Sequence, residues 1–331
     1  MKSMKALAAL ALAIAMALAL AACGGGANSS SGSSASGESS SASAPSASSS
    51  SAVSESATGQ APSEAYMIAK LDMKYRDGST MVSSYTFDDR GRQLTGSWDT
   101  ASSESTYDGD ETFTDWDEYG HMARTVTTED YGDGNPSTTE TEVLSQDLNA
   151  DGSLASVTLV NTFSKDKFEE GEAASTKETD TFEYGSDVQV CRKREMKTEL
   201  FDKSGALLAT QTQTNEFDEG GLQTRCTLKN VYADGTELNQ AADITWTKGA
   251  DGKPVSYTLV LSQDGADAMT NTGDVKTDES GLISWIGNVK VNGEALATEA
   301  TIEHVKISNP LPNAYEGWKS FAISDVLLKR A

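Results

Sequence analysis

Alternate oxygen-bearing side chains make the clearest candidate for metal chemistry in this chain. Asp147, Asn149 and Asp151 precede Gly152 and match the first half of a calcium-binding loop, in which alternate oxygens coordinate the ion. The twelfth position of such a loop is a bidentate glutamate, but here it is Thr158. Two interpretations stay open: a calcium site, or a turn whose side chains bond to the backbone.

Two cysteines, Cys191 and Cys226, are candidates for a disulfide, which is the usual state of paired cysteines outside the cytoplasm. In successive antiparallel strands, however, they would lie two strand spacings apart, about 10 Å. Bridged Cα atoms lie within about 7 Å. Strand alternation also places Cys226 on an apolar face and Cys191 on a polar one. We therefore expect free thiols, with the disulfide as the alternative.

Side chains that dominate enzyme catalysis are scarce. The two histidines, His121 and His304, are far apart in the sequence, so neither a histidine-based triad nor a multi-histidine metal centre is predicted. The 50 Asp and Glu residues offer many carboxylate pairs of the kind that hydrolyse glycosides, but no motif singles one out. We expect a protein that is not an enzyme, with an acid-dependent glycan hydrolase as an alternative.

The charge balance restricts the partners of the chain. Fifty acidic residues against 26 basic ones give a net charge of −24, which argues against binding to nucleic acid or to anionic lipid. The segment Arg192-Lys193-Arg194 with Lys197 is the exception. It is interpreted either as cross-strand pairing with Glu178, Asp180 and Glu183 or as a docking patch for an acidic polymer.

The N-terminus carries an export signal. Lys2 and Lys5 precede an apolar run from Ala6 to Ala22, and small residues stand before Cys23. The ending Leu20-Ala21-Ala22-Cys23 resembles the lipobox of bacterial lipoproteins. The resemblance implies a signal peptide over 1–22, acyl chains such as palmitate on Cys23, and anchoring outside the cytoplasm. Two or more acyl chains hold a protein stably on a membrane.

The resemblance leaves the host envelope open. Residue 24 is Gly rather than Asp, which in a two-membrane host would permit sorting to the outer membrane. The anchor is therefore expected either on the outer face of the cell membrane or in the outer membrane.

A linker separates the expected anchor from a folded domain. Residues 23–61 are nearly all Ser, Gly and Ala, which cannot bury enough apolar surface to order the chain. As a flexible coil this linker would reach roughly 30–35 Å. Residues 62–312 form the expected folded domain, and 313–331 the expected C-terminal cap over the last exposed sheet edge.

An acidic turn ending in glycine recurs through the domain. Its glycines are spaced by between 29 and 36 residues: Gly91, Gly120, Gly152, Gly185, Gly221, Gly252 and Gly281. Between these turns, Thr, Val, Tyr and Trp alternate with polar residues, which predicts half-buried strands. The predicted fold is all-β: an antiparallel meander of about 14–16 strands in hairpin repeats.

The shape of the sheet follows from how polar its strands are. Thr138 to Glu142 and Thr210 to Glu216 have little apolar content on either face. We expect an extended or curved sheet or an open barrel, with a closed barrel as the competing form and the better core in the C-terminal half. A lipid-facing outer-membrane barrel is not predicted, because Thr/Glu tracts would interrupt its apolar band.

The turn Phe87-Asp88-Asp89-Arg90-Gly91, followed by a strand, resembles the YD repeat of the RHS type. The likeness covers roughly 87–285 and implies stacked β-hairpins. The spacing exceeds the usual YD period of about twenty residues, and the chain is too short for the shell that such repeats build.

These patterns favour an envelope-anchored lipoprotein that binds or organises an extracytoplasmic macromolecule such as a glycan, wall polymer or protein. The alternative is a carrier of a lipid or other hydrophobic ligand in a half-barrel, which needs a concave face rich in Leu, Phe and Met. No cofactor other than calcium is suggested. A solute-binding transporter component is not expected, because its α/β fold needs helices.

Overall fold

The structure is a computed structural model. It describes residues 64–75, 78–101, 106–116, 122–130, 135–150, 153–168, 171–186, 189–308, 310 and 320–324. The expected signal peptide, Cys23, the expected linker, His121 and Asp151 therefore lie outside the described residues. Within the described part of the chain, no helix is long and apolar enough to cross a membrane.

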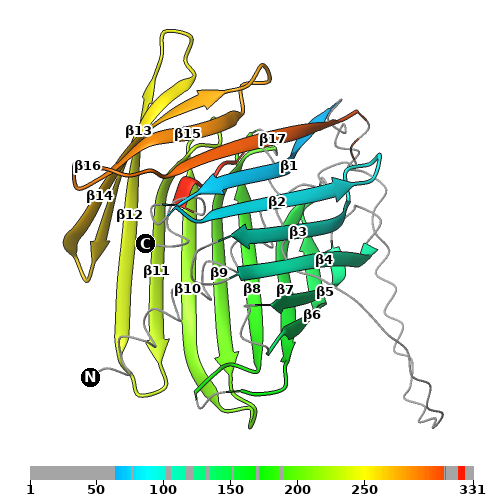
Figure 1. The fold of residues 1–331 in the computed structure, drawn as a ribbon. Helices are drawn as coiled ribbons and strands as arrows, with labels where there is room; N and C mark the ends of the chain where they lie inside the picture. Colours follow the sequence, from blue (N-terminus) through cyan, green and yellow to red (C-terminus); the bar gives the residue numbers. More distant parts are fainter. Residues whose placement is uncertain are drawn as a thin grey trace.

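The described chain forms seventeen strands, each antiparallel to its neighbours (Figure 1). In chain order they are β1 (Ala65–Lys74), β2 (Thr80–Phe87), β3 (Gln93–Ala101), β4 (Thr106–Trp116), β5 (Met122–Asp130), β6 (Ser137–Leu148), β7 (Leu154–Ser164), β8 (Ser175–Tyr184), β9 (Cys191–Phe201), β10 (Leu207–Phe217), β11 (Gln223–Tyr232), β12 (Glu237–Lys248), β13 (Pro254–Gln263), β14 (Ala266–Thr277), β15 (Ile283–Val291), β16 (Glu294–Ala295) and β17 (Glu299–Ile307). The predicted all-β antiparallel meander is confirmed.

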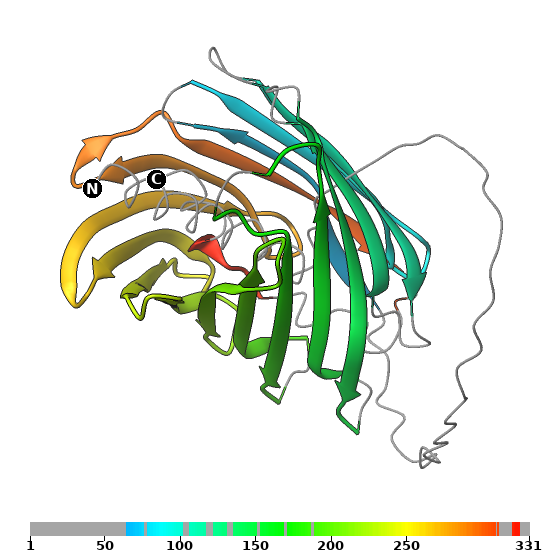
Figure 2. The same ribbon diagram turned by 90° about the horizontal axis from the view of Figure 1, so that it is seen from below.

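The meander closes into a barrel. Strand β1 pairs with β2 on one side and with β17 on the other, from Ala65 opposite Ile307 to Lys74 opposite Glu299. Strand β17 in turn pairs with β15 at only two positions, while β16 is a two-residue arm on β15. The closed form thus holds rather than the open one, because the first strand covers the edge of the last. Figure 2 shows β1–β6 facing β7–β12 across the interior.

The recurring glycine turns all lie at one rim of the barrel. Seven of the hairpins, from β2–β3 to β14–β15, join an even-numbered strand to the next odd-numbered one, so their turns share an end. We call these the rim turns. Most have a one-residue shift in strand register next to the turn. Phe87 is opposite Gln93 but Thr86 is opposite Thr95, and Phe217 is opposite Gln223 but Glu216 is opposite Arg225. One hairpin per unit, two strands and two turns, accounts for the spacing of about thirty residues.

Backbone hydrogen bonds use the acidic residues of the rim turns. Asp88 Oδ1 accepts from the amides of Arg90 (2.9 Å) and Arg92 (2.8 Å). Asp218 Oδ1 likewise accepts from Gly220 (2.8 Å) and Leu222 (2.9 Å). These carboxylates therefore satisfy amides that the tight turn would leave without partners.

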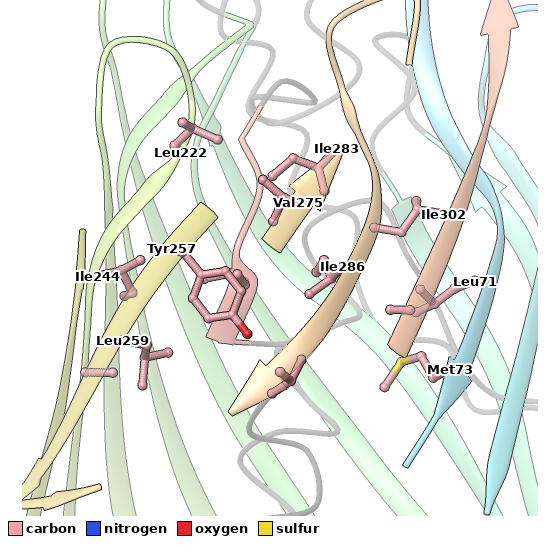
Figure 3. Close-up of a cluster of buried hydrophobic side chains, with 14 of the residues drawn as sticks. Leu71, Met73, Leu222, Ile244, Tyr257, Leu259, Val275, Ile283, Ile286 and Ile302 are labelled. Atoms are coloured by element: carbon pink, nitrogen blue, oxygen red, sulfur yellow. The ribbon is translucent and has the colours of Figure 1, made fainter. Parts of the chain in front are cut away.

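Apolar packing concentrates in the later strands, as the sequence predicted. Side chains from β1, β12–β15 and β17 meet inside the barrel (Figure 3). We call this the apolar cluster. Its buried members are Leu71, Met73, Tyr75, Leu222, Ala242, Ile244, Tyr257, Leu259, Val275, Ile283, Ile286, Val289, Ala300, Ile302 and Ile323.

Two large aromatic side chains lie over glycines on the neighbouring strand. Trp98 is directly opposite Gly109, and Tyr257 is directly opposite Gly273. A Cβ atom at Gly109 would lie 1.9 Å from the Trp98 ring, and one at Gly273 would lie 2.7 Å from the Tyr257 hydroxyl. Glycine is therefore required at both positions for the rings to lie flat on the sheet.

Residues 320–324 lie inside the barrel. The Phe321 amide donates to Gly221 O (2.7 Å) and its carbonyl accepts from the Gln223 amide (3.2 Å). Ile323 is fully buried in the apolar cluster. The expected cap over 313–331 is otherwise outside the described residues, and the edge of β17 is covered by β1. Figures 1 and 2 show this red segment between the two walls.

Candidate functional site: a polar wall inside the barrel

Polar side chains line the inner face of the middle strands. Strand alternation produces this surface: on β8, Thr176, Glu178 and Asp180 are buried, whereas Lys177 is exposed and Thr179 is half-buried. The same pattern continues from β5 to β11. We call this surface the polar wall; its buried members are Thr125, Thr127, Thr139, Thr141, Asn161, Thr176, Glu178, Asp180, Arg194, Thr198, Gln211, Gln213, Asn215 and Asn230.

Members of the wall are hydrogen-bonded across the strands. Thr141 Oγ1 donates to Asn161 Oδ1 (2.6 Å), and Asn161 Nδ2 donates to Thr176 Oγ1 (3.0 Å). Further along, Gln211 Nε2 donates to Asn230 Oδ1 (2.7 Å). Each of these pairs is directly opposite in the register of its two strands. The inner face of these strands therefore holds polar side chains that satisfy one another by hydrogen bonds across neighbouring strands.

A buried charged centre lies in the wall. Glu178, Asp180 and Arg194 are 2%, 0% and 1% exposed. The Arg194 guanidinium donates to Asp180 Oδ2 and lies 5.5 Å from the centroid of the Phe182 ring. A guanidinium keeps its proton, and a buried cation needs an anion beside it. Asp180 supplies that anion.

The second carboxyl, Glu178, is in a different state. Burial and the nearby Asp180 carboxylate raise the pKa of Glu178 to about 8, against the influence of Arg194 and a 3.1 Å hydrogen bond from Thr198 Oγ1. Burial also raises the pKa of Asp180, but its direct ion pair with Arg194 opposes this. We assign the negative charge to Asp180 and a proton to Glu178 at neutral pH. The three groups then carry no net charge.

Two carboxyls with separated pKa values are the arrangement that hydrolases use as acid and base. Here, however, Asp180 is held in its ion pair with Arg194 and Glu178 accepts a hydrogen bond from Thr198, so both carboxyls are engaged within the wall. The geometry supports hydrogen bonding and charge balance within the wall. The sequence predicted cross-strand pairing between these acids and the basic segment, but not that Glu178, Asp180 and Arg194 would be buried inside the barrel.

The candidate calcium ligands are used locally. Asp147 Oδ2 accepts from Ser156 Oγ (2.9 Å), and Asn149 Nδ2 donates to Ser153 Oγ (3.0 Å). Asp151 is outside the described residues. In the part of the chain that the structure describes, no three His, Cys, Asp or Glu side chains are grouped to hold a metal.

Cys191 and Cys226 are not bridged to each other; they lie on β9 and β11, with β10 between them. The expectation that they face opposite sides is wrong, since Cys191 is buried in an inner cluster with Leu154 and Phe182, and Cys226 packs against the apolar cluster. The reason is a bulge at the start of β9. Cys191 is opposite Tyr184 and Lys193 is opposite Glu183, so one extra residue, Arg192, stands between them on β9. The inside–outside alternation of the side chains therefore shifts by one residue.

The basic segment on β9 is matched within the sheet. Lys193 Nζ is 3.1 Å from Glu183 Oε1, and Arg194 pairs with Asp180, as cross-strand pairing predicted. Arg192 Nε donates to the Phe217 carbonyl (3.0 Å), and Lys197 pairs with Glu199 on its own strand. These contacts account for the cluster without an external acidic polymer.

Of the two histidines, His304 lies within the described residues, on β17. Its Nδ1 lies 3.1 Å from Asp278 Oδ2, at the rim turn between β14 and β15. Burial lowers the pKa of His304, and the Asp278 carboxylate partly offsets this. The histidine therefore tethers β17 to this turn beside the short β15–β17 pairing.

Comparisons with known proteins give little. Neither protein-family models nor curated proteins match the chain. Among solved structures, a porin-like protein from Bacteroides vulgatus is 9% identical over 71% of this chain and 97% of its own, with a TM-score of 0.37. A porin-like protein from Bacteroides uniformis is 14% identical over 71% of this chain and 96% of its own, with a TM-score of 0.33. Scores of this size support no inference about function.

Proposed function

We propose that the protein is a non-enzymatic, lipid-anchored envelope protein that binds a polar extracytoplasmic polymer, such as a glycan or wall polymer, through the polar wall. The observation that carries this proposal is the row of buried hydroxyl and amide side chains across β5–β11, several of which are hydrogen-bonded to one another. Burying polar groups adds little net stability even when they are paired. Because stability alone does not require these polar side chains, and the same barrel has an apolar cluster elsewhere, we infer that the polar wall binds a polar ligand.

The location rests on the sequence. The apolar run ending at Cys23 supports export and acylation, and the Ser/Ala/Gly linker would hold the barrel off the membrane. Replacing Cys23 with Ala should move the protein from the membrane fraction to the soluble fraction, and mass spectrometry should find acyl chains only on the parent. Membrane retention of the variant without acylation would overturn the lipid anchor.

Binding to the polar wall can be tested with the mature chain carrying Cys23→Ser, which stays soluble. Soluble glycans and wall-polymer fragments are titrated by calorimetry. Gln213→Leu removes an inner amide at similar volume, whereas Thr212→Val changes its neighbour on the opposite face. We expect Gln213→Leu to weaken binding at least tenfold and Thr212→Val to leave it unchanged. Equal affinities in both variants, or no binding by the parent, would contradict the proposal.

A further inference from the structure

The apolar cluster differs from the rest of the core in how it is filled. Leu71, Tyr257, Leu259, Ile286 and Ile302 come from the barrel wall and converge inside it (Figure 3). The cluster also contains Ile323, which is 0% exposed and belongs to no strand. The barrel thus has an apolar interior region in which one of the packed side chains comes from a segment outside the strands.

That segment is attached to the sheet by a few local hydrogen bonds and by burial, not by a strand ladder. It makes a single isolated bridge to the sheet, between Phe321 and Leu222. Its other described hydrogen bonds include those between Ser324 and the Gln223 side chain and between Ser320 Oγ and Cys191 O (3.1 Å). All seventeen strands keep their ladder partners without it. Its release would therefore leave the barrel backbone intact.

Releasing residues 320–324 would break their hydrogen bonds with Gly221 O, Cys191 O and the backbone and side chain of Gln223, but Gln223 would keep other partners. Gln223 Nε2 keeps its 2.9 Å hydrogen bond to Asn215 Oδ1, and the Trp246 indole keeps its bond to Gln223 O (2.7 Å). The space left by Ile323 would be lined by aliphatic and aromatic side chains. Cavities of that kind stay dry and bind apolar molecules.

We propose that the apolar cluster is a binding site for an aliphatic chain, such as the acyl chain of a lipid, and that residues 320–324 occupy it when no ligand is bound. The tail and the ligand compete for the same space. The apparent affinity of the site is therefore reduced by the fraction of molecules in which the tail is docked. This site is separate from the polar wall, and its ligand is recognised by burial alone.

The test uses the mature chain with Cys23→Ser and palmitic acid as the probe. Binding is followed by calorimetry, and release of the tail by hydrogen exchange of the Phe321 and Ser324 amides, which are hydrogen-bonded to Gly221 and Gln223. We expect saturable binding of one palmitate, with exchange in 320–324 at least tenfold faster and exchange in the barrel strands no faster.

A tail variant gives the sharper result. Ile323→Ala weakens the competitor, so palmitate should bind at least tenfold more tightly than to the parent. Leu228→Ala makes a similar truncation in the wall, outside the apolar cluster, and should leave the affinity unchanged. If Ile323→Ala does not fold, Ile323→Val should give a smaller shift in the same direction.

Three outcomes would overturn the proposal: no saturable binding by parent and tail variant, binding without faster exchange in 320–324, or equal affinity of parent and tail variant. Because palmitate carries no glycan, none of these results depends on whether the polar wall binds a polymer.

Discussion

Replacing Glu178 with Gln should change how the stability of the barrel depends on pH. The carboxyl is buried beside Asp180, which raises its pKa from 4.5 to about 8. Gln keeps an oxygen that can accept the hydrogen bond from Thr198 Oγ1, but it does not titrate. The substitution therefore removes the proton and retains most of the shape.

The sign follows from where the proton binds. Below pH 4.5 the carboxyl is protonated in both the folded and the unfolded chain, so the stability it allows is fully present. Between pH 4.5 and 8 the unfolded chain releases the proton and the folded chain keeps it. The free energy of unfolding then falls as pH rises, by at most about 1.4 kcal/mol per pH unit and on the order of 5 kcal/mol in total.

The assay is urea unfolding of the parent and of Glu178→Gln at pH 4, 6 and 8, followed by tryptophan fluorescence. The two curves should lie closest at pH 4, and the variant should become the more stable by several kcal/mol at pH 8. Glu183→Gln removes an exposed carboxyl from the same strand and is the matched control. A difference between parent and Glu178→Gln that stays constant from pH 4 to 8 would refute the assignment of the proton.

Three further substitutions test the packing. Arg194→Met leaves its buried carboxylate partner without a counter-ion and should cost about 3–5 kcal/mol in urea unfolding at pH 7. Gly273→Ala places a Cβ against the buried Tyr257 ring and should cost about 1–3 kcal/mol, most of which a Tyr257→Leu background should remove. Asp218→Ala deletes two backbone hydrogen bonds of a rim turn and should cost about 1–2 kcal/mol, whereas Glu219→Ala at the exposed neighbouring position should change the melting temperature little. An Asp218→Ala melting curve equal to that of Glu219→Ala would show that the turn does not need its carboxylate.

The hairpin repeat could be predicted because it is encoded locally. The turns after β2, β10 and β14 use an acid to accept backbone amides and a glycine with positive φ, as Gly91 and Gly221 have at 85° and 83°. Turns of this kind leave a visible spacing in the sequence. The richer core of the later strands was also visible, since Leu259 and Ile286 stand in strands with one clearly apolar face.

The polar wall could not be predicted because alternation gives two faces without saying which one is inside. On β8, Thr176, Glu178 and Asp180 are no more apolar than the Lys and Thr residues between them. Closure of the barrel likewise depends on the twist that accumulates over the whole sheet. The sequence of a single strand does not predict it. The bulge before Lys193 reverses the face of Cys191, and its position is set by pairing with β8.

The pairing of β1 with β17 has a consequence for how the chain reaches its folded state. All the remaining long ladders join strands that are consecutive in the sequence, and the β15–β17 pairing is only two positions long. These hairpins can therefore form while the chain is being made. Ala65 and Ile307, in contrast, stand at opposite ends of the domain. Closing a loop of that size is entropically expensive and slow. During folding, one edge of β1 therefore stays unpaired until the last strand has been made. In this interval the incomplete barrel is most exposed to pairing with another chain.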